Sequence, residues 1–290
     1  MRRTALMLWA MLVLAGCSPT MLLNALAPES VYHKAEGLAY GDDPRQRLDV
    51  YTPRHLSAPA PVVLFFYGGS WNSGERADYA FVGEALAARG LVVVIADYRL
   101  YPQVRYPAFL HDSAQALAWV VREVAAYQGD PQQLFVMGHS AGAYNAAMLA
   151  LDPRLLAAVD LSPDVMRGWI GLAGPYDFLP IENPAVKPVF MHPDSPPDSQ
   201  PINQVRAEAP PALLVAAAED ALVDPQRNTG GLARRLGEAG VRVETHYYTG
   251  VNHLTLVGAL ARPLRGLAPV LDDSVRFVLS DAGRHARTLP

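Results

Sequence analysis

Apolar and polar residues alternate along this chain with two different periods, which together predict a protein of the α/β class. Continuous apolar runs such as 62–67 are typical of strands buried on both faces of a parallel sheet. Alternating polar and apolar residues at 47–51 predict an edge strand, and apolar residues at helical spacing predict the helices. We expect further strands at 91–96, 134–137, 169–173, 212–217 and 241–247, and helices at 78–89, 112–127, 141–151, 226–238 and 269–279.

The order of these elements predicts one doubly wound, mostly parallel sheet with helices on both faces. A length of 290 residues is ordinary for a single α/β domain, and a hydrophobic content of 51% suits a large core. Residues 174–211 are rich in proline, which disfavours long helices. We expect this stretch to be an irregular insertion over one face of the sheet, and to build a substrate pocket.

The N-terminus has the pattern of a targeting signal. Arg2 and Arg3 precede a short apolar stretch at 6–14, and small residues lead to Cys17. The apolar stretch is short for a membrane span. Three segments are therefore predicted: a lipoprotein signal peptide at 1–16, a tether at 17–35 and the folded domain at 36–290.

Cys17 is the only cysteine of the chain, so it has no internal disulfide partner. The segment resembles a bacterial lipoprotein signal, in which cleavage precedes the cysteine and the new N-terminus is lipidated. Several acyl chains on one residue anchor a protein stably, so we expect a membrane-tethered protein of the bacterial cell envelope. Ser18 resembles the residue that follows the cysteine in outer-membrane lipoproteins. The alternative is an ordinary cleaved signal peptide with an incidental cysteine.

Charge and composition argue against several classes of function. The formal net charge is −4 and no run of like charge occurs, so electrostatics does not support nucleic-acid binding. No paired His, Cys or Asp residues have the spacing of a metal site. We expect no metal and no organic cofactor.

A strand–turn–helix motif provides the first candidate chemistry. Gly138-His139-Ser140-Ala141-Gly142 follows an apolar run and precedes an Ala-rich helical stretch, which is the context in which Gly-x-Ser-x-Gly exposes a nucleophilic serine. The motif alone is weak evidence because glycine is common, and a plain strand-ending turn is the alternative. The motif becomes meaningful if a base, an acid and an oxyanion hole follow from other strand ends.

Two later strand ends provide the base and the acid. His253 follows the strand 241–247 in a Gly-containing loop and can take the proton of Ser140. An acidic residue after the preceding strand would orient the imidazole, and both Asp220 and Asp224 are candidates. We prefer Asp220, which is closer to the strand end, because Asp224 before Pro225 fits a helix cap.

An oxyanion hole requires backbone N–H groups aimed at the developing negative charge. Ala141 follows the serine, and Gly69 and Ser70 lie in the loop after the strand 62–67, so we expect these three N–H groups to form it. A simple glycine turn is the alternative for that loop. Trp71 and Tyr144 are candidates for either the pocket or the core.

Several segments in this order resemble the esterase/lipase branch of the α/β-hydrolases. The nearest group contains feruloyl-esterase-like bacterial esterases, kynurenine formamidases and isoprenylcysteine methylesterases. The resemblance covers about residues 36–280 and rests on Arg47-Leu48-Asp49-Val50-Tyr51, Tyr67-Gly68-Gly69-Ser70-Trp71, Asp97-Tyr98-Arg99-Leu100, Tyr106-Pro107-Ala108, Asp112, Gly138-His139-Ser140-Ala141-Gly142, Glu219-Asp220 with Val223, and His253.

The resemblance implies an α/β-hydrolase fold with the acid at Asp220. Tyr67 replaces the histidine that usually opens the oxyanion loop, as in the isoprenylcysteine methylesterases. Asp97 and Arg99 are expected to form structural pairs beneath the site. The sequence thus predicts a serine hydrolase of small carboxylic esters that acts through an acyl-enzyme. Alternatives are an arylformamidase or other amide hydrolase with the same residues, and a catalytically inactive binding module.

Overall fold

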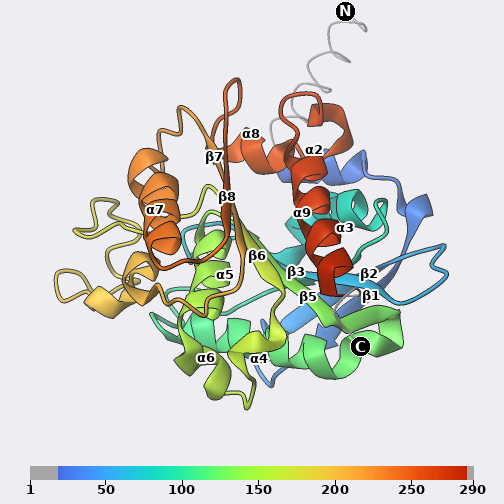
Figure 1. Ribbon diagram of the computed structural model, residues 1–290, viewed down its shortest axis with the longest axis horizontal. Coiled ribbons are helices and arrows are strands. Elements are labelled where there is room, and N and C mark those ends of the chain that lie inside the picture. Colours follow the sequence, from blue (N-terminus) through green and yellow to red (C-terminus); the bar gives the residue numbers. More distant parts are fainter. Residues whose placement is uncertain (1–18, 286–290) are drawn as a thin grey trace, which may run out of the picture.

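The computed structural model describes residues 19–285, whose strands form one sheet of eight strands between two layers of helices (Figure 1). The strands are β1 (Tyr32–Ala39), β2 (Arg47–Pro53), β3 (Ala60–Phe66), β4 (Val92–Ala96), β5 (Gly129–His139), β6 (Gly168–Leu172), β7 (Ala212–Ala217) and β8 (Val243–Tyr248). Their order in the sheet is β1-β2-β4-β3-β5-β6-β7-β8. The pairs β1–β2 and β2–β4 are antiparallel and the other pairs are parallel, as predicted for a mostly parallel sheet.

Helices cover both faces of this sheet. The α-helices are α2 (Pro19–Ala25), α3 (Ala80–Ala87), α4 (Ala108–Glu123), α5 (Ala141–Leu151), α6 (Pro153–Ala157), α7 (Gly231–Glu238), α8 (His253–Gly258) and α9 (Val270–His285). The 3-10 helix η2 (Arg76–Tyr79) precedes α3, and the π-helical turn η7 (Gln226–Gly230) precedes α7. Helices α3 and α9 contact each other on one side of the sheet, and α4, α5 and α6 pack together on the other (Figure 1).

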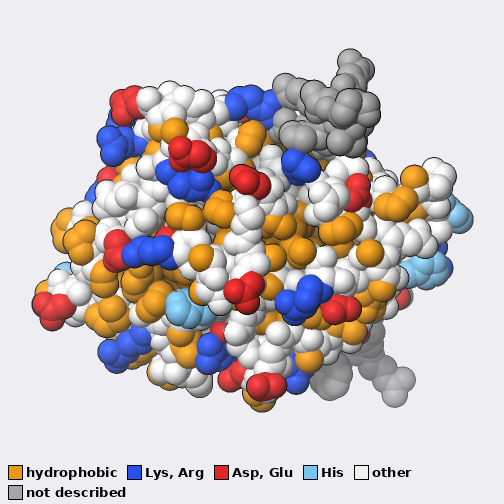
Figure 2. Space-filling view, turned by 60° about the horizontal axis from the view of Figure 1, so that its bottom comes forward, with side chains coloured by type: hydrophobic (Ala, Val, Ile, Leu, Met, Phe, Trp, Pro, Cys, Tyr) orange, Lys and Arg blue, Asp and Glu red, His pale blue; other side chains and the backbone are white. Residues whose placement is uncertain are grey.

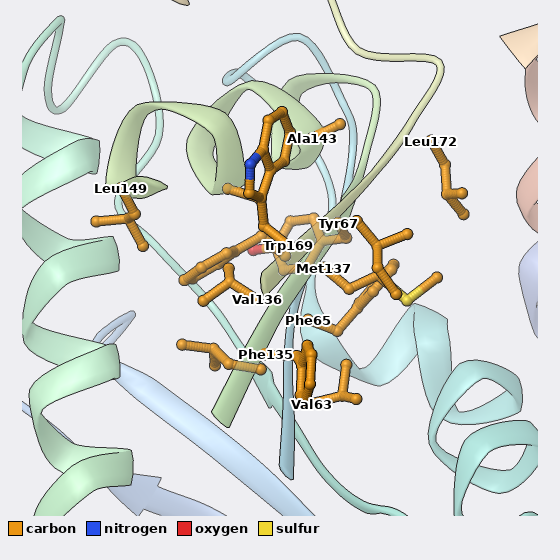
Figure 3. Packing of buried hydrophobic residues seen from close by; sticks show 14 of the residues in the cluster. Val63, Phe65, Tyr67, Phe135, Val136, Met137, Ala143, Leu149, Trp169 and Leu172 are labelled. Carbon is orange, nitrogen blue, oxygen red and sulfur yellow. The ribbon is translucent and has the colours of Figure 1, made fainter. Parts of the chain in front are cut away.

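The central strands are buried because helices cover both of their faces. Every residue of β4 and β7 is buried, and so are residues 62–66 of β3 and 134–137 of β5. Figure 3 shows side chains of β3, β5, β6 and α5 in this core, among them Phe65, Met137, Trp169 and Leu149. Their burial removes a continuous apolar surface from water, and the resulting stabilisation supports the loops at the strand ends.

The N-terminal boundary differs from the prediction. Within the predicted tether 17–35, the structure has the helix α2 and the first residues of β1. Asn24 fixes α2 against the layer of α3 through hydrogen bonds from Phe81 N (3.0 Å) and to Ala77 O (2.7 Å). Strand β1 is half exposed and mixes polar with apolar residues, so its apolar periodicity is too weak to predict a strand.

The segment 47–51 lies in β2, which is not an edge strand. Strand β1 pairs with its outer side and β4 with its inner side, so β1 and β8 are the edges of the sheet. Of the polar residues that suggested exposure, Arg47 donates to backbone carbonyls and Asp49 is buried in ion pairs. The side chain of Asp49 is fully buried and contacts Arg76 (2.7 Å) and Lys34 (3.1 Å). A buried ionised carboxylate is stable only when it is paired in this way.

The surface carries both signs of charge. Figure 2 shows acidic and basic side chains interspersed over one face, with apolar side chains between them. Between residues 19 and 285, no helix combines the length and the hydropathy that crossing a bilayer would require. Cys17 and the predicted signal peptide lie outside the described residues.

Candidate active site

Ser140 lies on a sharp turn between β5 and α5. Its backbone has φ 54° and ψ −121°, a sparsely populated conformation that costs about 1–3 kcal/mol. The surrounding glycines allow this turn because other backbone segments pass close to them. A Cβ on Gly138 would lie 2.1 Å from Gly142 O, and a Cβ on Gly142 would lie 2.0 Å from Phe66 O. The Gly-x-Ser-x-Gly pattern is therefore a steric requirement of this elbow, and it presents the serine hydroxyl at the end of the sheet.

His253 reaches the serine from the loop after β8. It is the first residue of α8, whose start is fixed by a capping box between Asn252 and Thr255. Its Nε2 lies 2.9 Å from Ser140 Oγ, and its Nδ1 lies 2.7 Å from Asp220 Oδ2. The imidazole is buried, so little water competes for these hydrogen bonds.

Asp220 stands three residues after β7, and the structure separates its role from that of Asp224. The second oxygen of Asp220 accepts hydrogen bonds from the N–H groups of Leu222 (2.9 Å) and Val223 (3.0 Å). Burial raises the pKa of Asp220, but His253 and these two N–H groups outweigh burial and hold it below its ordinary value. Asp224 instead accepts from the N–H groups that begin η7, at 2.8 and 2.9 Å, and so caps the next helix.

This geometry defines the proton positions. Asp220 is ionised at neutral pH, so Nδ1 of His253 carries a proton and donates a hydrogen bond to the carboxylate. Nε2 is then the acceptor for the hydroxyl of Ser140. A serine in this arrangement can lose its proton to the imidazole while its oxygen attacks an electrophilic carbon.

His139 is a fourth polar residue of the site, which the sequence did not single out. Its Nε2 lies 2.9 Å from the carbonyl oxygen of His253, and its Nδ1 is buried without a hydrogen-bond partner. Burial, together with the neighbouring His253, lowers the pKa of His139 to about 3. His139 is therefore neutral and donates from Nε2, which ties the elbow to the loop that carries His253.

Residues 67–74, here called loop 67–74, pass beside the serine at the end of β3. A Cβ on Gly68 would lie 2.9 Å from Ser140 Cβ. The loop has positive φ at Gly69 (125°), Ser70 (51°) and Trp71 (57°). Two consecutive non-glycine residues in this region indicate stored strain. The loop and the first N–H groups of α5 therefore converge on Ser140.

A cavity of about 370 Å³ opens at this junction. Ser70, Trp71, Ala141, Ser140 and His253 all line it, whereas Gly69 is in the same loop but not in the lining. The remaining wall comes from residues within 175–186 and 221–228. This confirms the prediction that the Pro-rich stretch 174–211 helps to build the pocket.

Trp71 has both of the roles that the sequence left open, whereas Tyr144 belongs to the core. Trp71 is 2% exposed, lines the cavity and donates from Nε1 to Asn145 Oδ1 at 3.0 Å. Its ring packs against Tyr144 and Phe190 with centroid distances of 5.0 and 4.9 Å. Tyr144 is fully buried behind it and donates its hydroxyl to Ser199 O.

Asp97 and Arg99 form structural pairs, as predicted, each with a different partner. Asp97 accepts a hydrogen bond from Arg76 Nη1 at 2.5 Å, and Arg99 binds the fully buried Asp112 at 2.7 Å. Among residues 19–285, no group of three or more His, Cys, Asp or Glu side chains is arranged to hold a metal ion.

Curated proteins are similar to this chain in sequence. The chain is 28% identical to the isoprenylcysteine alpha-carbonyl methylesterase ICME of Arabidopsis thaliana, over 83% of this chain and 61% of that protein. It is 33% identical to the esterase LipC of Mycobacterium tuberculosis, over 69% of this chain and 54% of that protein. The chain thus spans less than two thirds of either curated relative.

The fold and the family follow from two further comparisons. The hyperthermophilic esterase of the archaeon Pyrobaculum calidifontis superposes with a TM-score of 0.74 at 24% identity, over 91% of this chain and 90% of that one. This similarity confirms the predicted α/β-hydrolase fold. Residues 48–235, more than half of the chain, match the BD-FAE family, and this segment includes Ser140 and Asp220. The chain therefore belongs to the BD-FAE family.

Proposed function

We propose that this protein is a serine hydrolase of small carboxylic esters. The observation that carries the proposal is the continuous hydrogen-bonded series Asp220–His253–Ser140, which ends in a cavity of about 370 Å³. The chain order serine, acid, histidine is that of α/β-hydrolases. The names of the relatives, a methylesterase and an esterase, support the same bond type.

The geometry supports a two-step mechanism. Ser140 Oγ attacks the ester carbonyl while His253 Nε2 accepts its proton, and N–H groups of Gly69, Ser70 and Ala141 stabilise the oxyanion. The imidazolium then gives this proton to the departing alcohol, which leaves an acyl-enzyme. Water loses a proton to His253 as it attacks the acyl carbon, and the acid is released when the proton returns to Ser140.

Covalent labelling and turnover test the nucleophile. We expect wild-type protein to react with a fluorophosphonate probe and to hydrolyse p-nitrophenyl acetate, and we expect Ser140→Ala to lose the label and roughly 10⁶-fold in kcat. Circular dichroism should show that the variant is folded. A folded wild-type protein that neither labels nor hydrolyses esters would favour the alternative of an inactive binding module.

A second pair of variants tests the acid. Asp220→Asn keeps the shape of the side chain but favours the wrong imidazole tautomer, so kcat should fall by about 10⁴-fold. Asp224→Asn is the matched control, because asparagine caps a helix as well as aspartate does, and its kcat should stay close to wild type. A larger loss in Asp224→Asn than in Asp220→Asn would exchange their roles.

The acyl bond itself is tested by a substrate panel. The same residues could hydrolyse an aryl formamide, because the tetrahedral intermediate is alike. We propose that the ester is preferred, so kcat/KM for p-nitrophenyl acetate should exceed that for an N-formyl arylamine. Higher kcat/KM for the formamide would reverse this assignment.

We also propose that the protein is a lipoprotein of the bacterial cell envelope, anchored by an acylated Cys17. The support is the sequence pattern before Cys17 and the serine that follows it, which indicates the outer membrane. Metabolic labelling with an alkynyl fatty acid should mark wild-type protein in the outer-membrane fraction. Labelling that persists in Cys17→Ala would contradict the anchor, and label in the inner membrane would contradict the location.

A further inference from the structure

Loop 67–74 adopts a conformation that its own backbone contacts do not explain. Positive φ angles occur at Gly69, Ser70, Trp71 and Gly74. Within the loop, Gly69 O accepts hydrogen bonds from Asn72 N (3.0 Å) and Ser73 N (3.1 Å). These bonds close only the tip of the loop and do not reach its two ends. Strained backbone persists when surrounding groups hold it, so the ends of the loop require an external restraint.

Arg45 contacts both ends of the loop. This residue lies in the turn between β1 and β2, and its Nη2 donates to Tyr67 Oη and to Gly74 O, both at 2.8 Å. Its Nε donates to Tyr98 O at 3.0 Å, just beyond β4. One planar guanidinium therefore joins the first residue of the loop, the last residue of the loop and the segment that follows β4.

The phenol of Tyr67 completes this contact on its other side. It donates to Asp97 Oδ1 at 2.8 Å, and the same oxygen accepts from Arg76 N at 2.7 Å. Burial and the nearby Asp97 raise the pKa of Tyr67 well above its ordinary value, while Arg45 lowers it by less, so the phenol stays protonated as a donor. The ring of Tyr67 stacks on those of Tyr79 and Tyr98, with centroids 5.5 and 5.0 Å away.

We propose that Arg45 is a positioning residue that holds loop 67–74 in the shape that directs its N–H groups at the reacting carbonyl. This inference rests on the proposed ester hydrolysis. Arg45 does not line the cavity, so its loss should leave ground-state binding unchanged. The N–H groups matter most when negative charge develops on the carbonyl oxygen, so the loss should appear in kcat.

Arg45→Met tests the proposal against Arg265→Met as a matched control. Arg265 likewise links distant groups: it contacts the buried carboxylate of Glu84 (Oε2, 3.0 Å) and donates to Leu260 O (2.9 Å). Neither of these partners belongs to loop 67–74. We expect kcat for p-nitrophenyl acetate to fall about 10- to 100-fold in Arg45→Met with KM within about two-fold of wild type. A fall in kcat no larger than that of Arg265→Met would overturn the proposal.

Arg45→Lys separates geometry from charge, and it is the second variant should Arg45→Met fold poorly. A single ammonium cannot reproduce three directed hydrogen bonds, so kcat should remain at least about five-fold below wild type. Full recovery of kcat by lysine would show that charge alone suffices. It would overturn the proposal that the three hydrogen bonds of Arg45 hold the loop, here called the Arg45 clamp. Inhibition by an aryl trifluoromethyl ketone, which forms an oxyanion on the serine, should weaken by the same factor as kcat/KM falls.

Hydrogen exchange distinguishes failure of this inference from failure of the proposed function. The amides of Asn72, Ser73 and Arg76 have hydrogen bonds that depend on the loop shape. We expect them to exchange at least about ten-fold faster in Arg45→Met and at the wild-type rate in Arg265→Met. Unchanged exchange in Arg45→Met would refute the clamp even if the protein hydrolyses esters, whereas faster exchange would support it even if the protein does not.

Discussion

The elbow around Ser140 and loop 67–74 follow adjacent parallel strands and share a strained backbone, but different contacts hold them. The elbow is fixed by backbone packing: Gly138 and Gly142 let neighbouring segments approach, and Ser140 N donates to Leu172 O at 2.8 Å. Loop 67–74 is held mainly by polar side chains, with Arg45 at both of its ends, and by one backbone hydrogen bond from Tyr101 N to Trp71 O. The side chain of Arg45 is about one third exposed, whereas the glycines of the elbow are buried.

This difference predicts different responses to mutation. A change in the elbow must displace strands and helices of the core, so it should cost stability. A change in loop 67–74 can be absorbed by movement of the loop, so it should cost activity while the fold persists. Backbone strain in the elbow is thus coupled to the free energy of unfolding, whereas strain in loop 67–74 is coupled to the activation barrier of the reaction.

The largest effect on stability is expected for Gly142→Ala. The added Cβ would lie 2.0 Å from Phe66 O, and α5 would have to move away from β3. We expect the free energy of unfolding in urea to fall by about 3 kcal/mol. Gly237→Ala in α7 is the control, because no atom lies within 4 Å of its Cβ, and it should gain about 0.5–1 kcal/mol. If the two variants unfolded at the same urea concentration, the elbow would not be close-packed.

Gly69→Ala should affect activity more than stability. Gly69 has φ 125°, and its Cβ would lie 2.2 Å from Ser73 O, so the tip of the loop must change shape. We expect kcat for p-nitrophenyl acetate to fall about 100-fold, as for loss of an oxyanion-hole donor. Gly90→Ala is the control: it has φ 85° but open space around it, so it should lose about 1 kcal/mol of stability and no kcat. Equal kcat in the two variants would contradict the comparison.

The parts of the site that sequence could predict are those with local signals. Ser140 and Asp220 follow buried apolar strand segments, and His253 comes after the half-exposed edge strand β8. Parallel strands bring the segments that follow them to one edge of the sheet. The contacts of the two aspartates differ: Asp224 accepts from an N–H group two residues further along the chain, whereas Asp220 contacts His253 on another loop.

The missed features depend on contacts between distant segments. Arg45 belongs to no motif, and its partners Tyr67 and Gly74 lie on another loop. His139 stands inside the Gly-x-Ser-x-Gly motif, but its bond to the carbonyl of His253 spans 114 positions. Strand β1 is half polar because edge strands bury one side at most, so its pattern resembles that of a tether.

His139 gives the elbow one polar side-chain contact, and the pH dependence of protein stability tests whether its ring is neutral. The pKa of His139 is about 3 in the folded state against an ordinary value of 6.5, so the unfolded state binds more protons below pH 6.5. Burying the neutral ring therefore costs no unfolding free energy above about pH 6.5. As the pH falls from about 6.5 toward 3, the free energy of unfolding decreases, by about 2 kcal/mol at pH 5. Urea unfolding from pH 7 to 5 should show this loss in wild type.

Two variants assign that loss to the buried ring. His139→Gln has no titrating group at this position, so its unfolding free energy should fall by about 2 kcal/mol less than that of wild type between pH 7 and 5. His55→Gln removes an exposed histidine and should keep the wild-type dependence. A steep wild-type slope that persists in His139→Gln would place the titrating group elsewhere.

The smallest effect is expected for Tyr67→Phe, which tests how the clamp is divided between its members. Phenylalanine keeps both ring stacks but removes the acceptor for Arg45 and the donor to Asp97. Arg45 retains Gly74 O and Tyr98 O, and Asp97 retains Arg76, so the ends of the loop stay joined. We expect kcat to fall about three-fold with KM unchanged, equivalent to about 0.7 kcal/mol in the barrier. A fall as large as that of Arg45→Met would mean that the phenol, rather than the guanidinium, closes the loop.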